Sequence, residues 1–445
     1  MNYRYFLALL LISSGHCWAS VKSYFNQNEQ QTYIDPYRKI ERKGDDLERI
    51  ILDEIRSAKK SIFLAVQELR LPLVAQALIE KFNQGIDVRI VLEHNYNYNA
   101  LDLPAPPVNE ESEATPPSSL NIFIDTNRNG VLEKEELEAR DAIYMIQKAK
   151  LPLIDDASDG TSGSGLMHHK FMIIDGKKTL VSTANFTLGC IHGDYHRPQS
   201  RGNANSLVVV NSVLFSKIFL DEFQQLWGNG RRGNFGHKKT YRGPQRVMVQ
   251  DTEIIVQFSP TSQRFNWNES VNGLISKQIS EARKSVRAAL FVFSDQRLAN
   301  TMQDVQDKGA SIGVIVEPGF AWRDYSELLD LAGTRMLGPK CTYEADNNPW
   351  SKPADEFGMA RPADGDMLHH KFAVIDEQVT VVGSQNWTAS ANHVNDETLL
   401  VIKNRSVSES YSREYRRVKR TAFMGLPRWI TAQIEKNERE CASNR

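Results

Sequence analysis

The octapeptide His168-His169-Lys170-Phe171-Met172-Ile173-Ile174-Asp175 decides the fold of this chain, because it returns as His369-His370-Lys371-Phe372-Ala373-Val374-Ile375-Asp376. Six residues beyond each copy lies a short polar turn, Ser182-Thr183-Ala184-Asn185 in the first and Gly383-Ser384-Gln385-Asn386 in the second. Side chains two positions apart leave an extended strand on the same face. Each copy is therefore expected to present one imidazole and one ammonium group together.

The repeat extends outward from these octapeptides. Ala58 to Ile62 returns as Ala282 to Val286, and Gly85 returns as Gly309, both at an offset of 224 residues. Apolar periodicity predicts the order helix, strand, helix, strand in each half. The predicted strands are 62–66 and 88–92 in the first half, and 286–293 and 312–316 in the second. We therefore predict an α/β fold of two pseudo-symmetric sandwich domains, each with a mixed β-sheet covered by helices.

The chain begins with features of an export signal. Arg4 precedes an apolar run from Phe6 to Ile12, and Cys17-Trp18-Ala19 is typical of a cleavage site. We expect a signal peptide at 1–19 and a secreted or periplasmic protein. The remaining predicted segments are a first domain at 45–228, a linker at 229–250, a second domain at 251–425 and a C-terminal tail at 426–445.

Charge and cysteine content narrow the functional classes. The chain has 54 basic and 55 acidic residues, a balance that argues against broad, charge-driven binding of nucleic acid. The basic linker is expected to be solvated, with contact to anionic lipid or nucleic acid as the alternative. Cys190, Cys341 and Cys441 remain after signal cleavage, which suggests one disulfide and one free thiol.

Together the two octapeptides and their polar turns resemble the HKD signature of the phospholipase D superfamily, over roughly Asp46 to Phe423. The resemblance implies one phosphoryl-transfer site at the interface of two phospholipase D-like domains. It also implies a covalent phosphohistidine, with His168 as nucleophile and His369 as general acid, although the pseudo-symmetry leaves the reverse assignment open. Two imidazoles can fill both roles near neutral pH, so no cofactor is expected for catalysis. The implied catalytic set is His168, Lys170, Asp175, Asn185, His369, Lys371, Asp376, Asn386 and Glu397.

Roles within this set differ. The lysines and asparagines are expected to stabilise the non-bridging oxygens, whereas Asp175 and Asp376 are expected to brace turns. His169 and His370, on the other strand face, are expected to pack or to support other groups. Family members usually place an acidic residue after the polar turn, where it can orient a motif histidine. Glu397 fits that position in the second half, but the first half has Asn205. The two histidines should therefore differ electrostatically.

An insertion distinguishes the first half. The two motif histidines are 201 residues apart instead of 224, so the first half has 23 extra residues, assigned to about 100–140. This segment matches the complete EF-hand pattern. We expect a structural Ca²⁺ there, with an acidic turn that binds nothing as the alternative. The segment 120–124 suggests a strand and 135–147 a helix. The expected ligands are Asp125, Asn127, Asn129, Val131 and Glu136, with Glu133 bridged by water.

These features favour a monomeric phosphoric diester hydrolase of the phospholipase D type, acting on phospholipid at a membrane surface to release phosphatidate and a head-group alcohol. A secreted nuclease with the same two-histidine mechanism is the main alternative. A cardiolipin-synthase-like transferase and a calcium-dependent binding protein are less favoured. Segments 155–165 and 346–366 flank the motifs and are either lids or ordinary loops.

Overall fold

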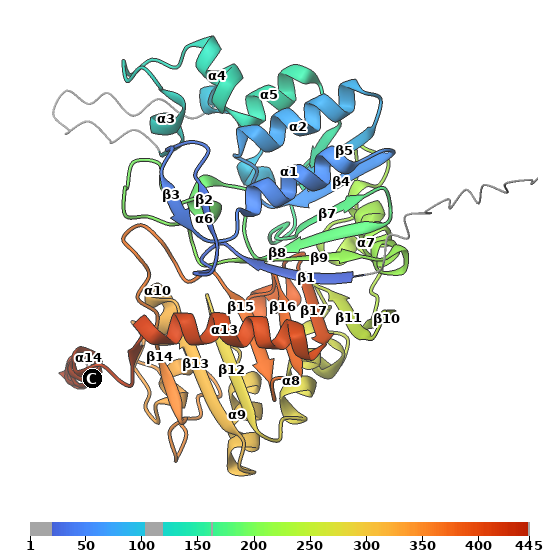
Figure 1. The fold of residues 1–445 in the computed structure, drawn as a ribbon. Coiled ribbons are helices and arrows are strands. Elements are labelled where there is room, and N and C mark those ends of the chain that lie inside the picture. The colour runs from blue at the N-terminus through green and yellow to red at the C-terminus, as the bar shows by residue number, and fades with distance from the viewer. Residues whose placement is uncertain (1–19, 103–118, 162, 444–445) are drawn as a thin grey trace, which may run out of the picture.

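The structure is a computed structural model that describes residues 20–102, 119–161 and 163–443. The expected export signal at 1–19 and part of the insertion, 103–118, lie outside these residues. Two large mixed sheets with helices on their faces form the two halves of the chain (Figure 1). This arrangement confirms the α/β prediction.

The first sheet has seven strands, which pair in the order β1-β9-β8-β7-β4-β5-β6. The strands β4, β5 and β6, at one end of this order, run parallel, whereas β4–β7, β7–β8, β8–β9 and β9–β1 are antiparallel pairs. The strand bounds are β1 (Ser20–Phe25), β4 (Ser61–Val66), β5 (Asp87–Leu92), β6 (Leu153–Asp155), β7 (Lys170–Ile174), β8 (Lys178–Ser182) and β9 (Ser206–Asn211). A separate hairpin contains β2 (Thr32–Ile34) and β3 (Glu41–Lys43).

The second sheet has nine strands in the order β10-β11-β17-β16-β15-β12-β13-β14-β18. Its central part repeats the first sheet, because β12, β13 and β14 are parallel and β15 is antiparallel to β12. The bounds are β10 (Gln245–Val249), β11 (Thr252–Phe258), β12 (Ser285–Leu290), β13 (Ser311–Val316), β14 (Glu356–Met359), β15 (Lys371–Ile375), β16 (Val379–Gly383), β17 (Thr398–Lys403) and β18 (Phe423–Met424).

The helices form an outer and an inner layer. In the first half they are α1 (Leu47–Ser57), α2 (Pro72–Asn83), α3 (Ser119–Ile124), α4 (Lys134–Arg140), α5 (Ala142–Ala149), α6 (Leu188–Ile191) and α7 (Val213–Trp227). In the second they are α8 (Val271–Ser280), α9 (Gln296–Asp307), α10 (Pro318–Ala321), α11 (Glu327–Leu331), α12 (Ala389–His393), α13 (Arg405–Thr421) and α14 (Arg428–Ser443). Asp46 and Ser270, 224 residues apart, accept the N-terminal N–H groups of α1 and α8.

Alternation along β7 explains the layers. Phe171 and Ile173 belong to the core shared by both halves, whereas Met172 and Ile174 face the first half's own core under α1, α2 and α5. The shared core contains α7 and α13, and α13 contacts β1 of the first sheet as well as β12 and β15 of the second. The two halves therefore pack as one unit through their inner helices.

Several segments differ from the predicted boundaries. Residues 20–25 precede the predicted first domain, but they form β1 at the edge of the first sheet. The segment 245–249 was assigned to a solvated linker, but as β10 it pairs with β11. Lys239, also within the predicted linker, has a buried side chain, with its Nζ atom 2.5 Å from Glu222 and 2.7 Å from Asp396. The solvated-linker interpretation is therefore wrong at these positions, because buried carboxylates attract the ammonium group.

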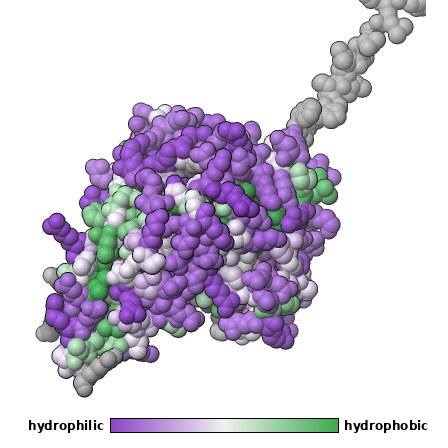
Figure 2. Space-filling model, turned by 90° about the horizontal axis from the view of Figure 1, so that it is seen from below, coloured by the Kyte–Doolittle hydropathy of each residue, from purple (hydrophilic) through white to green (hydrophobic). Residues whose placement is uncertain are grey.

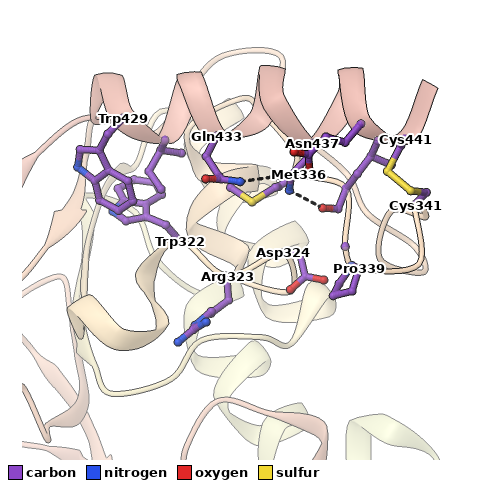
Figure 3. Close-up of a pocket in the computed structure, with 14 residues that line it drawn as sticks. Trp322, Arg323, Asp324, Met336, Pro339, Cys341, Trp429, Gln433, Asn437 and Cys441 are labelled. Carbon is purple, nitrogen blue, oxygen red and sulfur yellow. Dashed lines mark hydrogen bonds between the residues drawn. A yellow bond between two sulfur atoms is a disulfide. The ribbon is translucent and has the colours of Figure 1, made fainter. Parts of the chain in front are cut away.

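The C-terminal segment is also ordered into a helix. Cys341 and Cys441 form a disulfide that ties α14 to the loop after α11, and Cys190 is a buried free thiol. Figure 3 shows this disulfide at one end of a pocket between α14 and that loop, with Trp322 and Trp429 at the other end. Asn437 donates to the carbonyl oxygen of Leu337 across the same gap.

The surface seen in Figure 2 is mostly hydrophilic, with a strip of hydrophobic residues along one side. Among the described residues, no helix has both the length and the apolar character needed to cross a membrane.

Candidate active site

The two motif histidines meet at the interface of the halves. His168 and His369 lie two residues before the first residues of β7 and β15, and they are 6% and 7% exposed. The backbone N–H of His168 donates to Asp396 at 2.9 Å, and that of His369 donates to Ala204 at 3.1 Å. Each motif is therefore held by backbone from the other half, and neither half makes the site alone.

The orienting contacts of the two imidazoles also cross between the halves. Nδ1 of His168 lies 2.6 Å from Oε2 of Glu397, and Nδ1 of His369 lies 2.9 Å from Oδ1 of Asn205. A hydroxyl supports each partner, since Ser384 donates to Glu397 at 2.6 Å and Thr183 donates to Asn205 at 2.8 Å. The geometry is therefore symmetric but the charge is not.

The two lysines are buried beside the histidines. Nζ of Lys170 donates to the carbonyl oxygen of His168 at 2.8 Å, and Nζ of Lys371 makes the same bond to His369. Their other neighbours differ. Lys170 donates to the amide oxygen of Gln67 at 3.1 Å, whereas Lys371 lies 4.8 Å from the centroid of the Phe291 ring. The first half therefore places a polar side chain beside its lysine, and the second half places an aromatic ring beside its own.

Burial controls protonation. It lowers the pKa of both His168 and His369 well below the usual histidine value, and Lys170 and Lys371 lower it further by repulsion. Burial also lowers the pKa of Lys170 to about 8 and raises that of Glu397 to about 7. These shifts favour neutral imidazoles, the form a nucleophile needs. A phosphodiester anion bound between the lysines would favour the charged lysines and a protonated imidazole, the form a general acid needs.

Each polar turn contains an asparagine whose amide oxygen has no partner in the described residues. The amide oxygens of Asn185 and Asn386 are buried and accept no hydrogen bond there. Buried polar atoms are rarely left unsatisfied, so these side chains are suited to meet a bound ligand.

The two distal aspartates lie away from this centre. Asp175 accepts the backbone N–H groups of Lys59, Lys60 and Ser61 in the turn before β4. Asp376 does the same before β12. Both side chains brace turns, as the sequence suggested.

Sequence reasoning missed two further pairs of carboxylates. Glu93 and Glu317, 224 residues apart, each accept the N–H directly before the motif, from Met167 and Leu368, at 2.6 Å. Their common offset was the signal that could have found them.

The second missed pair supports the second histidine of each motif. Glu222 lies 3.2 Å from Nε2 of His169, and Glu414 lies 2.6 Å from Nε2 of His370. These histidines therefore face the shared core, away from His168 and His369. The signal was an offset of 192, the same as that from Asn205 to Glu397.

The EF-hand-like loop lies between two helices. The strand predicted at 120–124 is wrong, because these residues belong to α3 and bury Phe123 and Ile124 against Leu137 of α4. The predicted helix at 135–147 is broken at Asp141, whose side chain caps α5. Gly130 has a φ of +79°, as the sharp turn of the pattern requires.

Four of the predicted calcium ligands accept hydrogen bonds from the backbone of their own loop. Asp125 accepts the backbone N–H groups of Asn129 and Gly130, and Glu136 accepts those of Thr126 and Asn127. The side-chain oxygen of Asn127 accepts the N–H of Asn129, and that of Asn129 accepts the N–H of Val131. The donor chemistry fits a hard cation, while the loop closes through its own backbone.

Each α/β half contributes one His-x-Lys motif to a common site. Such a tandem arrangement is suited to phosphoryl transfer. The chain belongs to the phospholipase D superfamily, since a family model described as "Cardiolipin synthase, PLD-like domain" matches residues 51–227 and 275–419.

Individual relatives agree with this family at low identity. The mitochondrial cardiolipin hydrolase of Mus musculus is 26% identical over 153 residues, covering 34% of this chain and 59% of that protein. A phospholipase D of Rickettsia bellii is 23% identical over 137 residues, covering 31% of this chain and 58% of that protein. The chain thus spans a little over half the length of these relatives. The phosphatidylserine synthase structure from Haemophilus influenzae has a similar fold, with a TM-score of 0.52, 11% identity, and coverage of 89% of this chain and 92% of that one.

Proposed function

We propose that this protein is a phospholipase D-type phosphodiesterase that hydrolyses a phospholipid to phosphatidate and a head-group alcohol. One observation carries the proposal: two buried His/Lys pairs face a common site, and each histidine is oriented by a residue from the other half. A phosphodiester requires a nucleophile on one side and a proton donor on the other. The two imidazoles supply both.

The charge difference between Glu397 and Asn205 supports one assignment of the roles. Nε2 of His168 attacks phosphorus, the bond from phosphorus to the leaving oxygen breaks, and His369 donates its proton to that oxygen. The phosphorylated ring of His168 is cationic, and the carboxylate of Glu397 at Nδ1 stabilises it. His369 then takes a proton from water, whose oxygen attacks phosphorus and releases His168. Beside neutral Asn205, a protonated His369 is a strong acid because no carboxylate stabilises its charge.

The remaining polar groups hold the anion. Lys170 and Lys371 face the non-bridging oxygens, supplying the positive charge that metal ions supply in many phosphoryl transferases. The side-chain NH2 groups of Asn185 and Asn386 donate to the same oxygens and complete this shell.

Two features support a lipid over a nucleic acid. The chain has a net charge of −1, whereas affinity for a phosphate backbone requires an excess of basic groups. In addition, the rings of Phe291 and Phe320 pack 4.9 Å apart beside the site, and that of Phe291 is 4.9 Å from His369. An apolar surface of this kind suits a substrate with hydrocarbon parts.

Transphosphatidylation tests the proposal. Purified protein is incubated with phosphatidylcholine or cardiolipin vesicles plus ethanol, and in parallel with plasmid DNA, with His168→Ala as the control in each reaction. Phosphatidylethanol formed only by the wild type establishes both a lipid substrate and a covalent intermediate. Cleavage of DNA without any lipid product would replace the phospholipase proposal with the nuclease alternative.

We also propose that the loop 125–136 binds a structural Ca²⁺. The complete EF-hand pattern and the flanking helices α3 and α4 support this. Calorimetric titration should show one Ca²⁺ site that Glu136→Gln abolishes, while Glu135→Gln, outside the ligand positions, retains it. An unchanged titration in Glu136→Gln would remove the proposal.

Export and a monomeric state remain proposals as well. The Cys341–Cys441 disulfide is typical of an oxidising compartment, and both motifs are present in one chain. The mass of the mature protein tests cleavage after Ala19, and light scattering tests the monomer.

A further inference from the structure

Three ligand-type side chains meet at the carboxyl edge of the first sheet. The parallel strands β5 and β6 pair Leu92 with Asp155, so the next residues, Glu93 and Asp156, lie side by side. Nδ1 of His94 is 2.9 Å from Oε1 of Glu93 and 3.0 Å from Oδ1 of Asp156. One ligand atom from each of the three lies within 4.8 Å of the others. Zinc ligands bound at ~2.1 Å with tetrahedral angles are roughly 3.4 Å apart, close to these spacings.

The cluster has an excess of buried negative charge. The side chains of Glu93 and Asp156 are both 0% exposed, whereas that of His94 is 29% exposed. Within the described residues, neither carboxylate forms an ion pair with a lysine or arginine. Hydrogen bonds from N–H groups of Met167, Asn95, His94 and Ser164 satisfy part of the two carboxylates without supplying a full positive charge. Metal coordination is one way to compensate two buried carboxylates.

A second cluster of the same composition provides a contrast. His169, Glu222 and Asp396 also bring three ligand atoms within 4.8 Å of one another. There, however, Nζ of Lys239 lies 2.5 Å from Glu222 and 2.7 Å from Asp396. That cluster contains the ammonium group of a lysine, whereas among the described residues the cluster at His94 pairs with no lysine or arginine, and His94 is its own single basic group.

The internal repeat shows that His94 and Asp156 are additions. Glu93 has a structural role that Glu317 shares, because each holds the backbone before its motif. The residue after Glu317 is Pro318, and the sheet register places Ala360 at the position of Asp156. Neither can bind a metal, so the repeat's structural role does not explain the two ligands found only in the first half.

Gly163 leaves space beside the ligand atoms of the cluster. A Cβ atom at Gly163 would lie 2.6 Å from Oδ2 of Asp156 and 2.8 Å from Nδ1 of His94. A side chain at this position would therefore occupy the space beside the ligand atoms. Gly163 adopts a φ of +86°, a conformation that glycine adopts without strain.

We propose that Glu93, His94 and Asp156 bind a divalent transition-metal ion of the zinc type, with water completing the coordination. Two carboxylates and one imidazole are ligands that Zn²⁺ accepts. Binding displaces the proton from Nδ1 of His94. The ion would tie β5 and β6 to the loop that leads into His168, because Glu93 also holds Met167 and Asp156 also accepts the N–H of Ser164 at 2.9 Å. Its role is structural, and it takes no part in the phosphoryl chemistry.

Binding of Co²⁺ and Zn²⁺ to the full chain tests this site without any activity assay. Chelator-treated, buffer-exchanged protein is titrated with Co²⁺ while visible absorption is recorded, and with Zn²⁺ in a calorimeter. One Co²⁺ per chain should give a d–d band that Zn²⁺ displaces. His94→Ala and Asp156→Asn should each abolish the band, while His196→Ala, at an exposed histidine outside the cluster, retains it.

Thermal unfolding keeps the outcome interpretable. Zn²⁺ should raise the Tm of the wild type and of His196→Ala, but not that of His94→Ala. If His94→Ala is poorly folded, His94→Gln, which keeps a polar side chain at this partly exposed position, is used in its place. A band or a Tm increase that persists in folded His94 and Asp156 variants overturns the proposal, as does the absence of binding to the wild type. Neither result bears on the phospholipase proposal.

Discussion

Glu397 in the second half lies 2.6 Å from His168 in the first, while the matching position across the interface, Asn205, lies 2.9 Å from His369. The two histidines of one site therefore have different partners, one ionisable and one neutral. A carboxylate stabilises a cationic ring and an amide does not. The proposed roles of His168 as nucleophile and His369 as acid follow from this difference.

Asn205→Asp should change the pH dependence of the reaction. A carboxylate beside His369 favours imidazolium, so the pKa of His369 rises and the protonated acid persists to higher pH. The basic limb of kcat/KM should move to higher pH, measured with the same lipid substrate across the range. Asn205→Ser is the control, because it removes the amide without adding charge. An unshifted limb in Asn205→Asp would contradict the assignment of His369 as acid.

His168→Ala and His369→Ala should both lose lipid hydrolysis by at least ~10³-fold, because nucleophile and acid act as a unit. They should differ with bis(p-nitrophenyl) phosphate, whose leaving group needs no protonation. Release of p-nitrophenol should remain measurable in the first turnover of His369→Ala and be absent in His168→Ala. Equal losses in the first turnover would speak against separate roles.

Glu222→Gln should destabilise the fold by ~3 kcal/mol, because it removes the buried carboxylate that pairs with His169 and one of the two that pair with Lys239. Differential scanning calorimetry measures the change. Asp221→Asn is the matched control on the same helix, since its pair with Lys217 is exposed and worth little.

The ion pairs of Glu222 also make the free energy of unfolding depend on pH. Burial alone would raise the pKa of Glu222, but Lys239 and His169 outweigh it and lower the pKa. The stabilisation is therefore fully present above the unfolded-state pKa of ~4.3 and is lost as the pH falls below it. The difference in stability between wild type and Glu222→Gln should shrink below about pH 4. A difference that stays constant there would argue against an ionised Glu222.

Cys441→Ser should release α14 while leaving the site intact. The disulfide and the bond from Asn437 to Leu337 anchor this helix far along the chain from both motifs. Amide exchange in 428–443 should become faster, with no change in kcat. Loss of activity in the variant would show that α14 supports the site.

The repeat made the fold and the site's composition predictable. Identical spacing in His168–Asn185 and His369–Asn386 required the same strand and turn twice, and one histidine on the same strand face as each lysine. The pattern of apolar residues predicted the central strands, because these residues either alternate with polar ones or form a short continuous run. These are local properties, which sequence encodes directly.

Packing between distant segments was beyond such reasoning. Glu397 contacts His168 because the two halves dock. Backbone bridges such as the one between Met167 and Asp396 form only then. Lys239 looked like a solvated linker residue because its partner, Glu222, lies on α7. The short apolar run 120–124 fits a strand or a helix equally well, and its contacts with α4 decided for a helix.

The central claim is that His168 carries the phosphoryl group. Mass spectrometry of His369→Ala after rapid mixing with bis(p-nitrophenyl) phosphate tests it most directly, because the variant lacks the base that activates water for the second step. The account predicts an acid-labile phosphoryl adduct on the peptide that contains His168, and none in the His168→Ala control. An adduct on any other residue, or p-nitrophenol release in one burst without an adduct, would contradict it.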